Sequence, residues 1–267
     1  MRADPSAELD ELQPRLEAGL AELGLALSEA QQLACLAHLR LVAQWGQVYN
    51  LTAVRSPADM LTHHLLDCLA VVPALQRHLA QTGWAQSATT TATAAAAPVN
   101  SPTHALNLES RQRPRLLDVG SGAGFPGVVL AVCLPGLDVV CVDTVAKKAA
   151  FIQQAAIALK LPNLRGVHAR VETLREPAFD VVTSRAFASL ADFVTLTRLH
   201  VKQPNPEVAH PSAVQAQGLW MAMKGQVPQA EIEALPPSAR LERVEPLSVP
   251  QLEAQRCLVW MSPAPAP

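Results

Sequence analysis

The segment LLDVGSGAGFPG (116–127) constrains the fold of this chain more than any other part of the sequence. A short apolar run ends in Asp118 and passes into a turn with three glycines, Gly120, Gly122 and Gly124. A helical stretch begins at Pro126. Glycine adopts the positive φ angles that such turns need and lets a ligand approach the backbone. A strand, a glycine-rich turn and a helix in this order predict a ligand site at the end of a strand in a parallel sheet.

Apolar segments typical of strands alternate with helical segments from residue 115 onward. The predicted strands, in chain order, are RLLDV (115–119), DVVCVD (138–143), LRGVH (164–168), FDVVTS (179–184) and GLWMAMK (218–224). Helices are predicted over 147–160 and 189–200. The last segments, ARLERVEPLSV (239–249) and RCLVWM (256–261), are predicted to form an antiparallel pair. The alternation predicts an α/β fold, with a mostly parallel sheet covered by helices on both faces.

The first 83 residues predict a helical extension in front of this sheet. Ser28 and Gln31 form a capping-box pattern, and Ser56 before Pro57 predicts a second helix start. Apolar stripes at helical spacing follow both starts. The first stripe comprises Leu33, Leu36, Ala37, Leu41 and Trp45, and the second comprises Leu61, Leu65, Cys68, Leu69 and Val72.

Low-complexity segments divide the chain. Residues 84–114 include an alanine- and threonine-rich run without apolar periodicity, which predicts a linker or a surface insertion. A similar segment, 203–217, is predicted to be an insertion within the second domain. We therefore expect a helical extension over 1–83, a sheet domain over 115–262 and a proline- and alanine-rich tail over 263–267.

The composition limits the class of protein and the compartment in which it can work. Hydrophobic residues make up 49% and charged residues 16% of the 267 residues, so a large core is possible and wholesale disorder is excluded. No apolar run approaches the roughly 18 residues of a membrane span. The five scattered cysteines include no CxxC pair and predict buried thiols in a reducing compartment. We expect a cytoplasmic protein with no membrane segment and no metal site.

The charge of the chain gives little support to a nucleic-acid partner. Its net charge is −2, although residues 111–200 hold eleven basic and seven acidic residues. On charge alone, ordinary variation of the surface explains this local excess better than a binding site.

Two cofactors compete for the glycine turn. Gly122 to Gly127 spells GxGxxG, the dinucleotide fingerprint, and Asp143 lies near the expected distance of a ribose-binding acid. A carboxylate at the mouth of the turn, Asp118, would repel a pyrophosphate. It suits the ammonium group of S-adenosylmethionine, which carries no phosphate and whose ribose Asp143 can hold. The order strand-Asp-x-Gly-x-Gly-x-Gly also resembles the first motif of Rossmann-like methyltransferases.

Two further strand ends carry candidate binding residues. Val171 and Glu172 follow the third strand, where they suit the ring and the amino group of an adenine, although a solvated acid explains Glu172 equally well. Arg185 and Phe187 follow the fourth strand, where amino-methyltransferases of this architecture often carry a D/N-P-P-Y/F motif that this chain lacks. A guanidinium and a phenyl ring suit a nucleobase through hydrogen bonds and stacking.

These segments together are similar to the glucose-inhibited division protein B family, the bacterial small-subunit (16S) rRNA guanine-N7 methyltransferases. The matching segments are YNLTAVR (49–55), HHLLDCLAV (63–71), LLDVGSGAGFPG (116–127), CVDTVAKKAAFI (141–152), ARVETL (169–174), SRAFASL (184–190) and MKGQ (223–226). They run in order across 20–83 and 115–261. The departures are the 84–114 segment, the insertion after His200 and the tail, none of which interrupts a motif.

The resemblance implies a Rossmann-like class I methyltransferase that binds S-adenosylmethionine. It implies methylation of a guanine in the decoding-region loop of 16S rRNA. The near-neutral charge predicts modest affinity for free RNA, so we expect the substrate to be the small ribosomal subunit or its precursor. It also implies cofactor contacts at Gly120, Phe125, Val171, Glu172 and Arg185.

Guanine N7 carries a lone pair and no proton, so the reaction needs alignment and no general base. We therefore expect Arg185 and Phe187 to position the reactants, and we assign proton transfer to no residue. Basic side chains that meet RNA phosphates would position the RNA without reading its sequence. The candidates are Lys224, Lys147, Lys148, Arg165 and Arg170.

Other interpretations stay open. The same cofactor site can serve a methyltransferase for a small molecule or a protein. A nicotinamide-dependent oxidoreductase would use the GxGxxG pattern, but the sequence holds no Tyr-xxx-Lys pair. The adjacent His63 and His64 point about 100° apart on a helix, so we expect one packed and one exposed side chain instead of a metal site.

Overall fold

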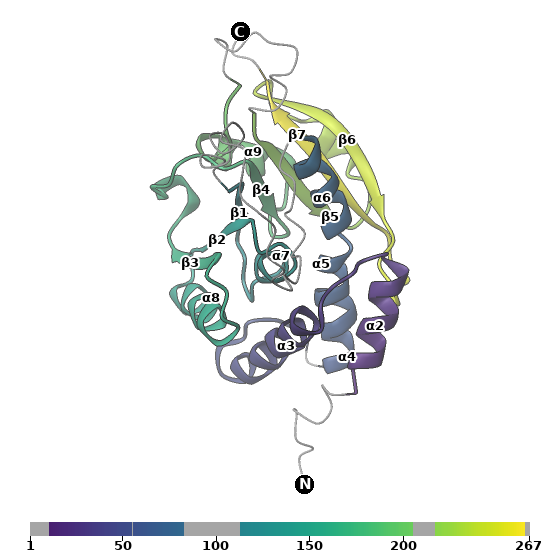
Figure 1. The fold of residues 1–267 in the computed structure, drawn as a ribbon. Helices are drawn as coiled ribbons and strands as arrows, with labels where there is room; N and C mark the ends of the chain where they lie inside the picture. The colour runs from purple at the N-terminus through teal and green to yellow at the C-terminus, as the bar shows by residue number, and fades with distance from the viewer. Residues whose placement is uncertain (1–10, 55, 83–112, 205–216, 265–267) are drawn as a thin grey trace, which may run out of the picture.

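A seven-stranded sheet forms the centre of the computed structural model, which describes residues 11–54, 56–82, 113–204 and 217–264. The strand order is β3-β2-β1-β4-β5-β7-β6 (Figure 1). The strands are β1 (Arg115–Val119), β2 (Asp138–Asp143), β3 (Leu164–His168), β4 (Val181–Ser184), β5 (Leu219–Lys224), β6 (Ala239–Leu247) and β7 (Arg256–Pro263). Strands β1 to β5 are parallel, and β7 runs antiparallel to β5 and β6. The predicted α/β fold and the antiparallel closing pair are confirmed.

The inner strands are buried on both faces. In β1, Leu116 belongs to the core on one face and Leu117 to the core on the other, and Val139 and Val140 of β2 divide in the same way. Successive side chains of a strand point to opposite faces, so a sheet covered on both faces needs continuous apolar strands. This explains the short apolar runs of the sequence.

Helices cover each face of the sheet. On one face lie α7 (Gly127–Cys133) and α8 (Ala146–Ala158), and on the other lie α9 (Leu190–Thr197) and α10 (Gln229–Glu233). The face of α7 and α8 also receives the N-terminal helices. These are α2 (Gln13–Glu22), α3 (Glu29–Tyr49), α4 (Pro57–Met60), the π-helical turn η1 (Leu61–Leu66), α5 (Asp67–Leu69) and α6 (Val72–Gln81).

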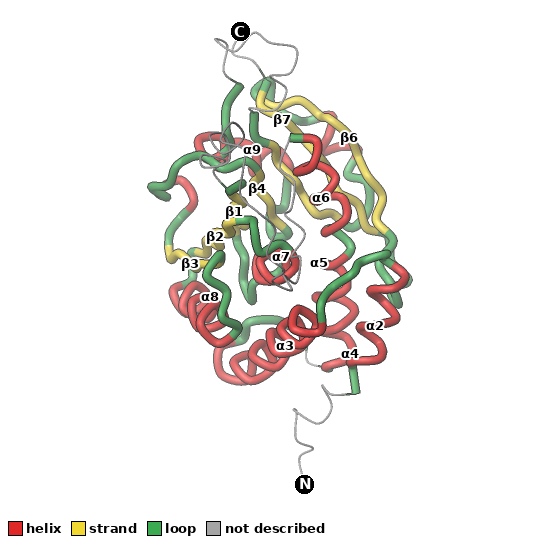
Figure 2. The backbone as a smooth tube through the Cα atoms, viewed as in Figure 1, coloured by secondary structure: helices red, strands yellow, loops and turns green. Residues whose placement is uncertain are grey.

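The N-terminal helices share a core with the sheet. Leu36 of α3, Leu65 of η1 and Val128 of α7 belong to the same cluster of buried side chains. Figures 1 and 2 show α3 and the run from α4 to α6 wrapped around the side of the sheet where α7 lies. These helices therefore complete a layer of the fold and border the carboxyl ends of the strands.

The local helix signals are confirmed, but one apolar stripe is buried only in part. Ser28 accepts the amide hydrogen of Gln31 and the Gln31 side chain accepts that of Ser28, which completes the capping box. The second predicted stripe is buried throughout. In the first stripe, Leu36 is buried and Leu41 and Trp45 pack against the core, but Leu33 is 50% exposed. Helix α3 also buries Cys35, Leu39 and Val42. Packing against α7 and α8 therefore decides which residues of α3 face the core.

Some of the expected segments lie wholly or partly outside the described residues. The 84–114 segment, apart from its last two residues, and most of the 203–217 insertion lie outside them. The expected tail begins inside β7, which extends to Pro263. All five cysteines are free and buried. Within the described ranges, no helix has both the length and the apolar character to cross a membrane.

Candidate active site at the carboxyl ends of the strands

Three adjoining pockets form a crevice at the carboxyl ends of the parallel strands. The Asp143 pocket is lined by Gly120, Asp143, Val171, Glu172, Ala186 and Phe187, among others. The glycine-turn pocket is lined by Thr52, His64, Gly120, Gly122, Phe125, Arg185 and Ala186, among others. The Asp67 pocket is lined by His63, His64, Asp67, Arg185, Lys224 and Arg256, among others. Neighbouring pockets share lining residues, so the three make one continuous crevice.

The glycine turn needs glycine for two reasons. Gly120, Gly122 and Gly124 have φ angles of +70°, +56° and +85°, which residues with a Cβ rarely adopt. A Cβ on Gly120 would lie 2.9 Å from the Cβ of Ala186, in the passage between the Asp143 and glycine-turn pockets. The turn is therefore shaped to leave room for a ligand against its backbone.

Asp118 lies behind the turn instead of at its mouth. Its side chain is 1% exposed, and Oδ2 accepts the amide hydrogen of Gly127, the first residue of α7, at 2.9 Å. Burial raises the pKa of this carboxyl to about 7. The structure therefore does not place Asp118 where it can meet a ligand's ammonium group. It holds the start of α7 against β1, because the carboxylate satisfies an amide that no helix carbonyl can reach.

Asp143 faces the crevice at the end of β2. Its Oδ2 accepts the amide hydrogen of Gly122 at 3.0 Å, and its Oδ1 accepts that of Val145 at 2.8 Å. A carboxylate oxygen has a second acceptor position, so both oxygens remain able to bind donors such as ribose hydroxyls. Asp143 thus ties the turn to β2 and presents an acceptor to the same pocket.

The far wall of the Asp143 pocket comes from the segment after β3. Val171 lies in a 3-10 turn (Val171–Thr173) and is buried, whereas Glu172 is exposed and 3.6 Å from Arg170. Phe187 lines this pocket too, and its ring packs against Phe193 of α9. The apolar surface here suits a planar ring.

Arg185 and Phe187 line different pockets of the crevice, and their expected contact with a nucleobase stays a prediction. The chain bends at Arg185 after β4. The bend sends the guanidinium toward the glycine-turn and Asp67 pockets, while Phe187 lies on the Asp143 side.

Phe125 lies between two imidazole rings. Its ring centroid is 4.7 Å from that of His38 and 4.8 Å from that of His64, and the Arg185 guanidinium carbon lies 5.7 Å from it. Phe125 is buried and forms part of the wall of the glycine-turn pocket. The N-terminal helices, which supply both histidines, therefore fix the position of this wall.

Both of these histidines are neutral at pH 7. Burial lowers the pKa of His38 and of His64 to about 4, and the charge of Arg185 adds to the effect at His64. The His63 carbonyl, which can only accept, lies 3.0 Å from Nδ1 of His64, so Nδ1 carries the hydrogen. Nε2 then accepts from the Thr52 hydroxyl at 2.6 Å. His64 is buried and His63 exposed, as the helical geometry predicted.

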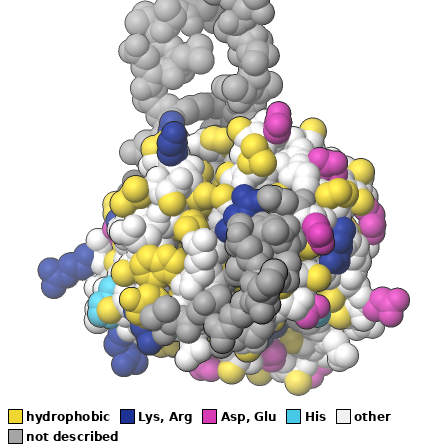
Figure 3. Space-filling model, turned by 90° about the horizontal axis from the view of Figure 1, so that it is seen from below, with side chains coloured by type: hydrophobic (Ala, Val, Ile, Leu, Met, Phe, Trp, Pro, Cys, Tyr) yellow, Lys and Arg dark blue, Asp and Glu magenta, His cyan; other side chains and the backbone are white. Residues whose placement is uncertain are grey.

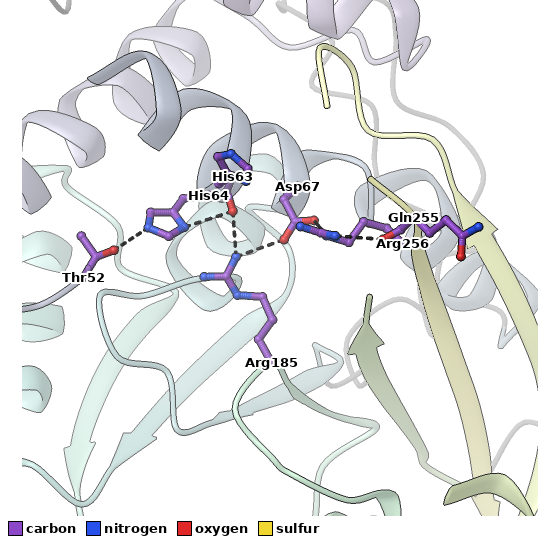
Figure 4. Close-up of polar contacts among 7 residues, drawn as sticks. All are labelled: Thr52, His63, His64, Asp67, Arg185, Gln255 and Arg256. Atoms are coloured by element: carbon purple, nitrogen blue, oxygen red, sulfur yellow. Dashed lines mark hydrogen bonds and ion pairs between the residues drawn. The ribbon is translucent and has the colours of Figure 1, made fainter. Parts of the chain in front are cut away.

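Asp67 binds two arginines at the opposite end of the crevice (Figure 4). Nη1 of Arg185 donates to its Oδ2 at 3.0 Å and to the His63 carbonyl at 3.3 Å. Nε of Arg256 donates to its Oδ1 at 2.9 Å. Sequence reasoning missed Asp67 and Arg256 as site residues. The available signal was an acid inside the buried stripe of HHLLDCLAV, since a buried charge needs a partner.

The π-helical turn η1 places these residues. It spans Leu61–Leu66 and holds both His63 and His64, and Asp67 follows it directly. A π turn changes the direction in which the side chains after it point, and such turns are frequent at functional sites. A regular helix would place His64 and Asp67 differently around the axis.

The predicted RNA-contact residues do not gather in one place. Lys224 lies in the Asp67 pocket, with Nζ 2.8 Å from Glu231. Lys147 and Arg170 are exposed, and Lys148 is half-buried at the start of α8. In the part of Figure 3 that is not grey, Lys and Arg side chains do not form one continuous patch.

Arg165 lies away from the crevice, and its contact with RNA phosphate stays a prediction. It is the second residue of β3, near the amino ends of the strands, and Nη2 is 2.8 Å from Glu176. Glu176 also binds Arg115 at the start of β1. Because parallel strands share one direction, a residue early in its strand lies at the edge opposite the crevice.

The family of the chain follows from comparison with known proteins. Residues 31–83 and 99–259 match the family model GidB, described as rRNA small subunit methyltransferase G. A SAM-dependent methyltransferase of Aquifex aeolicus is one similar solved structure, with a TM-score of 0.41, 16% identity and coverage of 57% of this chain and 84% of that one. The assignment of the Rossmann-like class I methyltransferase fold rests on the strand order and on the family match.

Curated relatives match almost the whole chain. Ribosomal RNA small subunit methyltransferase G of Paracidovorax citrulli is 53% identical over 254 residues, which cover 95% of this chain and 91% of that protein. Its counterpart in Polaromonas naphthalenivorans is 50% identical over 252 residues, which cover 94% of this chain and 96% of that protein. This chain therefore belongs to the rRNA small subunit methyltransferase G family.

Proposed function

We propose that this protein transfers a methyl group from S-adenosylmethionine to N7 of a guanine in small-subunit rRNA. The relatives at about half identity are named ribosomal RNA small subunit methyltransferases, which supports the substrate class. When bound, S-adenosylmethionine supplies a methyl group on a positively charged sulfur. The chain's own residues bind and align the reactants.

The crevice fits this cofactor. Asp143 offers acceptors to the ribose hydroxyls, Val171 and Phe187 offer apolar surface to the adenine, and the turn at Gly120 leaves room beside the backbone. Arg185 lines the next pocket, where a carboxylate of the methionine part can meet its guanidinium. Asp118 supports the turn from behind.

The same geometry disfavours a dinucleotide. A pyrophosphate in the GxGxxG arrangement is bound by free amides at the start of the helix. Here the amide of Gly127 is already bound to Asp118, whose carboxylate would repel a phosphate when it is ionised. The amides of Gly124 and Phe125, beside the second glycine of the pattern, already donate to the Ser121 carbonyl at 2.7 and 3.2 Å. The amides that would meet a pyrophosphate in the nicotinamide-dependent alternative are therefore occupied.

One observation carries the choice of N7. His64 Nε2 is occupied by Thr52, and Asp67 is occupied by its two arginines. Burial raises the pKa of Cys257, so its thiol stays protonated. Asp143 lies in the pocket proposed for the ribose, so we assign proton removal from the substrate to none of these groups. This suits a nucleophile with a lone pair and no proton, such as guanine N7, whose reaction depends on alignment.

Methyl transfer from labelled S-adenosylmethionine to small ribosomal subunits lacking the modification tests the proposal. Digestion of the rRNA and mass spectrometry of the nucleosides should reveal 7-methylguanosine. A different methylated nucleoside would contradict the N7 assignment. Label found in ribosomal proteins or in small molecules, with none in the rRNA, would favour the alternative substrates. Naked rRNA fragments, tested in parallel, should be poorer substrates because the near-neutral protein binds RNA weakly by charge alone.

A further inference from the structure

Asp67 joins three parts of the fold through one buried carboxylate. Its side chain is 4% exposed, and each oxygen holds one guanidinium, from Arg185 at 3.0 Å and from Arg256 at 2.9 Å (Figure 4). Asp67 follows the π turn, Arg185 follows β4, and Arg256 begins β7. The N-terminal helices therefore reach the end of the sheet at this point.

The three groups leave one uncancelled positive charge. Both guanidinium groups are charged at neutral pH, and Asp67 cancels one of them. Among their neighbours, Lys224 is paired with Glu231 and burial keeps His64 neutral. Asp118, whose pKa is about 7, attracts Arg185 from behind the glycine turn and cancels part of the remaining charge when it is ionised. Loss of the Asp67 charge would leave two positive charges facing each other in a largely buried place.

This cluster borders the pocket of the proposed cofactor. Arg185 lines both the Asp67 pocket and the glycine-turn pocket, so the charge of the cluster acts on a ligand there. The sulfur of S-adenosylmethionine is positive, and a guanine methylated at N7 is a cation. Two uncancelled guanidinium groups beside them would weaken binding of S-adenosylmethionine relative to S-adenosylhomocysteine, whose sulfur is uncharged. Both molecules carry the carboxylate that meets Arg185, so its attraction cancels in this comparison.

We infer that Asp67 is a positioning residue for methyl transfer, which holds Arg185 at the crevice and cancels one of the two positive charges there. The crevice can then accept a sulfonium next to an arginine. The inference rests on the proposed use of S-adenosylmethionine. The N-terminal helices, which supply Asp67, would then set the charge of the site as well as pack in the core.

The test compares two ligands that differ in charge at one atom. S-adenosylmethionine carries a methyl group and a positive charge on sulfur, whereas S-adenosylhomocysteine carries neither. Calorimetry on the full-length protein gives the ratio of their dissociation constants. In Asp67→Asn the preference for S-adenosylmethionine should fall about fivefold to tenfold, the size expected for one charge at a separation of about 12–17 Å and an effective dielectric constant of about 20. Asp67→Glu, which keeps the charge, should restore the ratio.

Arg256→Gln is a second variant, in which the ratio of the two dissociation constants should change in the opposite direction. Removal of this guanidinium leaves Asp67 and Arg185 as a neutral pair, so the preference for S-adenosylmethionine should rise. This variant also keeps the inference testable if Asp67→Asn does not fold. An unchanged ratio in Arg256→Gln would overturn the electrostatic part of the inference.

Glu176→Gln is the matched control. Glu176 also binds two arginines, Arg115 and Arg165, but at the amino ends of the strands. Its replacement should leave the ratio unchanged. If Asp67→Asn weakens both ligands by the same factor, Asp67 is a structural residue and the inference is wrong. If the wild-type protein binds neither ligand, the proposed function fails first, and that result is distinct from equal losses in the variant.

Discussion

The Asp118 carboxylate accepts the amide hydrogen of Gly127 at 2.9 Å and thereby joins the end of β1 to the start of α7. Gly127 has no room for a side chain, because a Cβ would lie 2.3 Å from Cys141 Sγ and 2.8 Å from Asp118 Oδ2. The strand and the helix are therefore locked together directly below the turn that shapes the crevice.

Asp118→Asn should become more stable relative to wild type as the pH rises. Burial raises the pKa of the folded carboxyl to about 7, from 3.8, so the folded protein holds a proton that the unfolded chain has lost. The stability contribution of this group is lost as pH rises through 7. Denaturant titrations give the unfolding free energy of Asp118→Asn minus that of the wild type. This difference should grow by about 3 kcal/mol between pH 4.5 and 7. A constant difference would show that the carboxyl ionises normally.

The buried His38 should make the protein sensitive to acid. Burial lowers its pKa to about 4, so as pH falls below 6.5 the unfolded chain takes up a proton before the folded one does. Its stability contribution is present above pH 6.5 and is lost toward pH 4. At pH 5 the loss should be about 2 kcal/mol. His38→Gln should remove this part of the pH dependence, and a variant that keeps the full wild-type slope would disprove the assignment.

Asp143→Ala should weaken binding of S-adenosylmethionine by about 10- to 100-fold, the value of one or two hydrogen bonds to a charged acceptor. The loss has two sources, the ribose contact and the support of the Gly122 amide. Isothermal calorimetry measures it directly. Asp143→Asn keeps an acceptor for that amide, so an equal loss in both variants would point to the charge itself.

Gly120→Ala should abolish detectable cofactor binding. The new methyl group would meet Ala186 at 2.9 Å, and a φ of +70° is strained for alanine, which should also cost about 1–2 kcal/mol of stability. Gly225→Ala is the control, because nothing lies within 4 Å of its Cβ position. Normal affinity in Gly120→Ala would place the ligand elsewhere.

Lys224→Ala should reduce turnover on ribosomal particles and leave the dissociation constant of S-adenosylmethionine within about twofold. Lys224 lies in the Asp67 pocket and outside the two pockets proposed for the cofactor. If it meets a phosphate, the salt dependence of RNA binding should also weaken by about one counterion. Glu231→Gln, which frees the lysine from its partner, should not reduce RNA affinity. A loss of cofactor affinity equal to that of Asp143→Ala would contradict this division.

The strands and helix starts were predictable because each depends on neighbours within a few residues. The apolar run before Asp118 needs burial on two faces, and the Ser28 side chain caps an amide three residues away. The phase of α3 was not predictable. Leu33 and Cys35 both begin stripes of helical spacing, and contact with α7 and α8 decides which stripe is buried.

The candidate site was predictable where it follows strand ends. Asp143, Val171, Glu172 and Arg185 do line the crevice, since parallel strands end at one edge. Asp118 was expected at the mouth of the turn, but its side chain is buried behind the turn. The sequence shows that Asp118 lies at the end of a strand, but it does not show on which side of the turn the carboxylate lies.

The sequence by itself determined the order of strands and helices, the glycine turn and the family, because these reside in short contiguous patterns. The tertiary structure alone decided that Asp67 meets Arg256, 189 residues away, and Arg185, 118 residues away. A charged residue within an apolar helix indicates that a partner of opposite charge lies nearby in the fold. Which partner it finds depends on how the N-terminal helices pack against the sheet, and no local pattern records that packing.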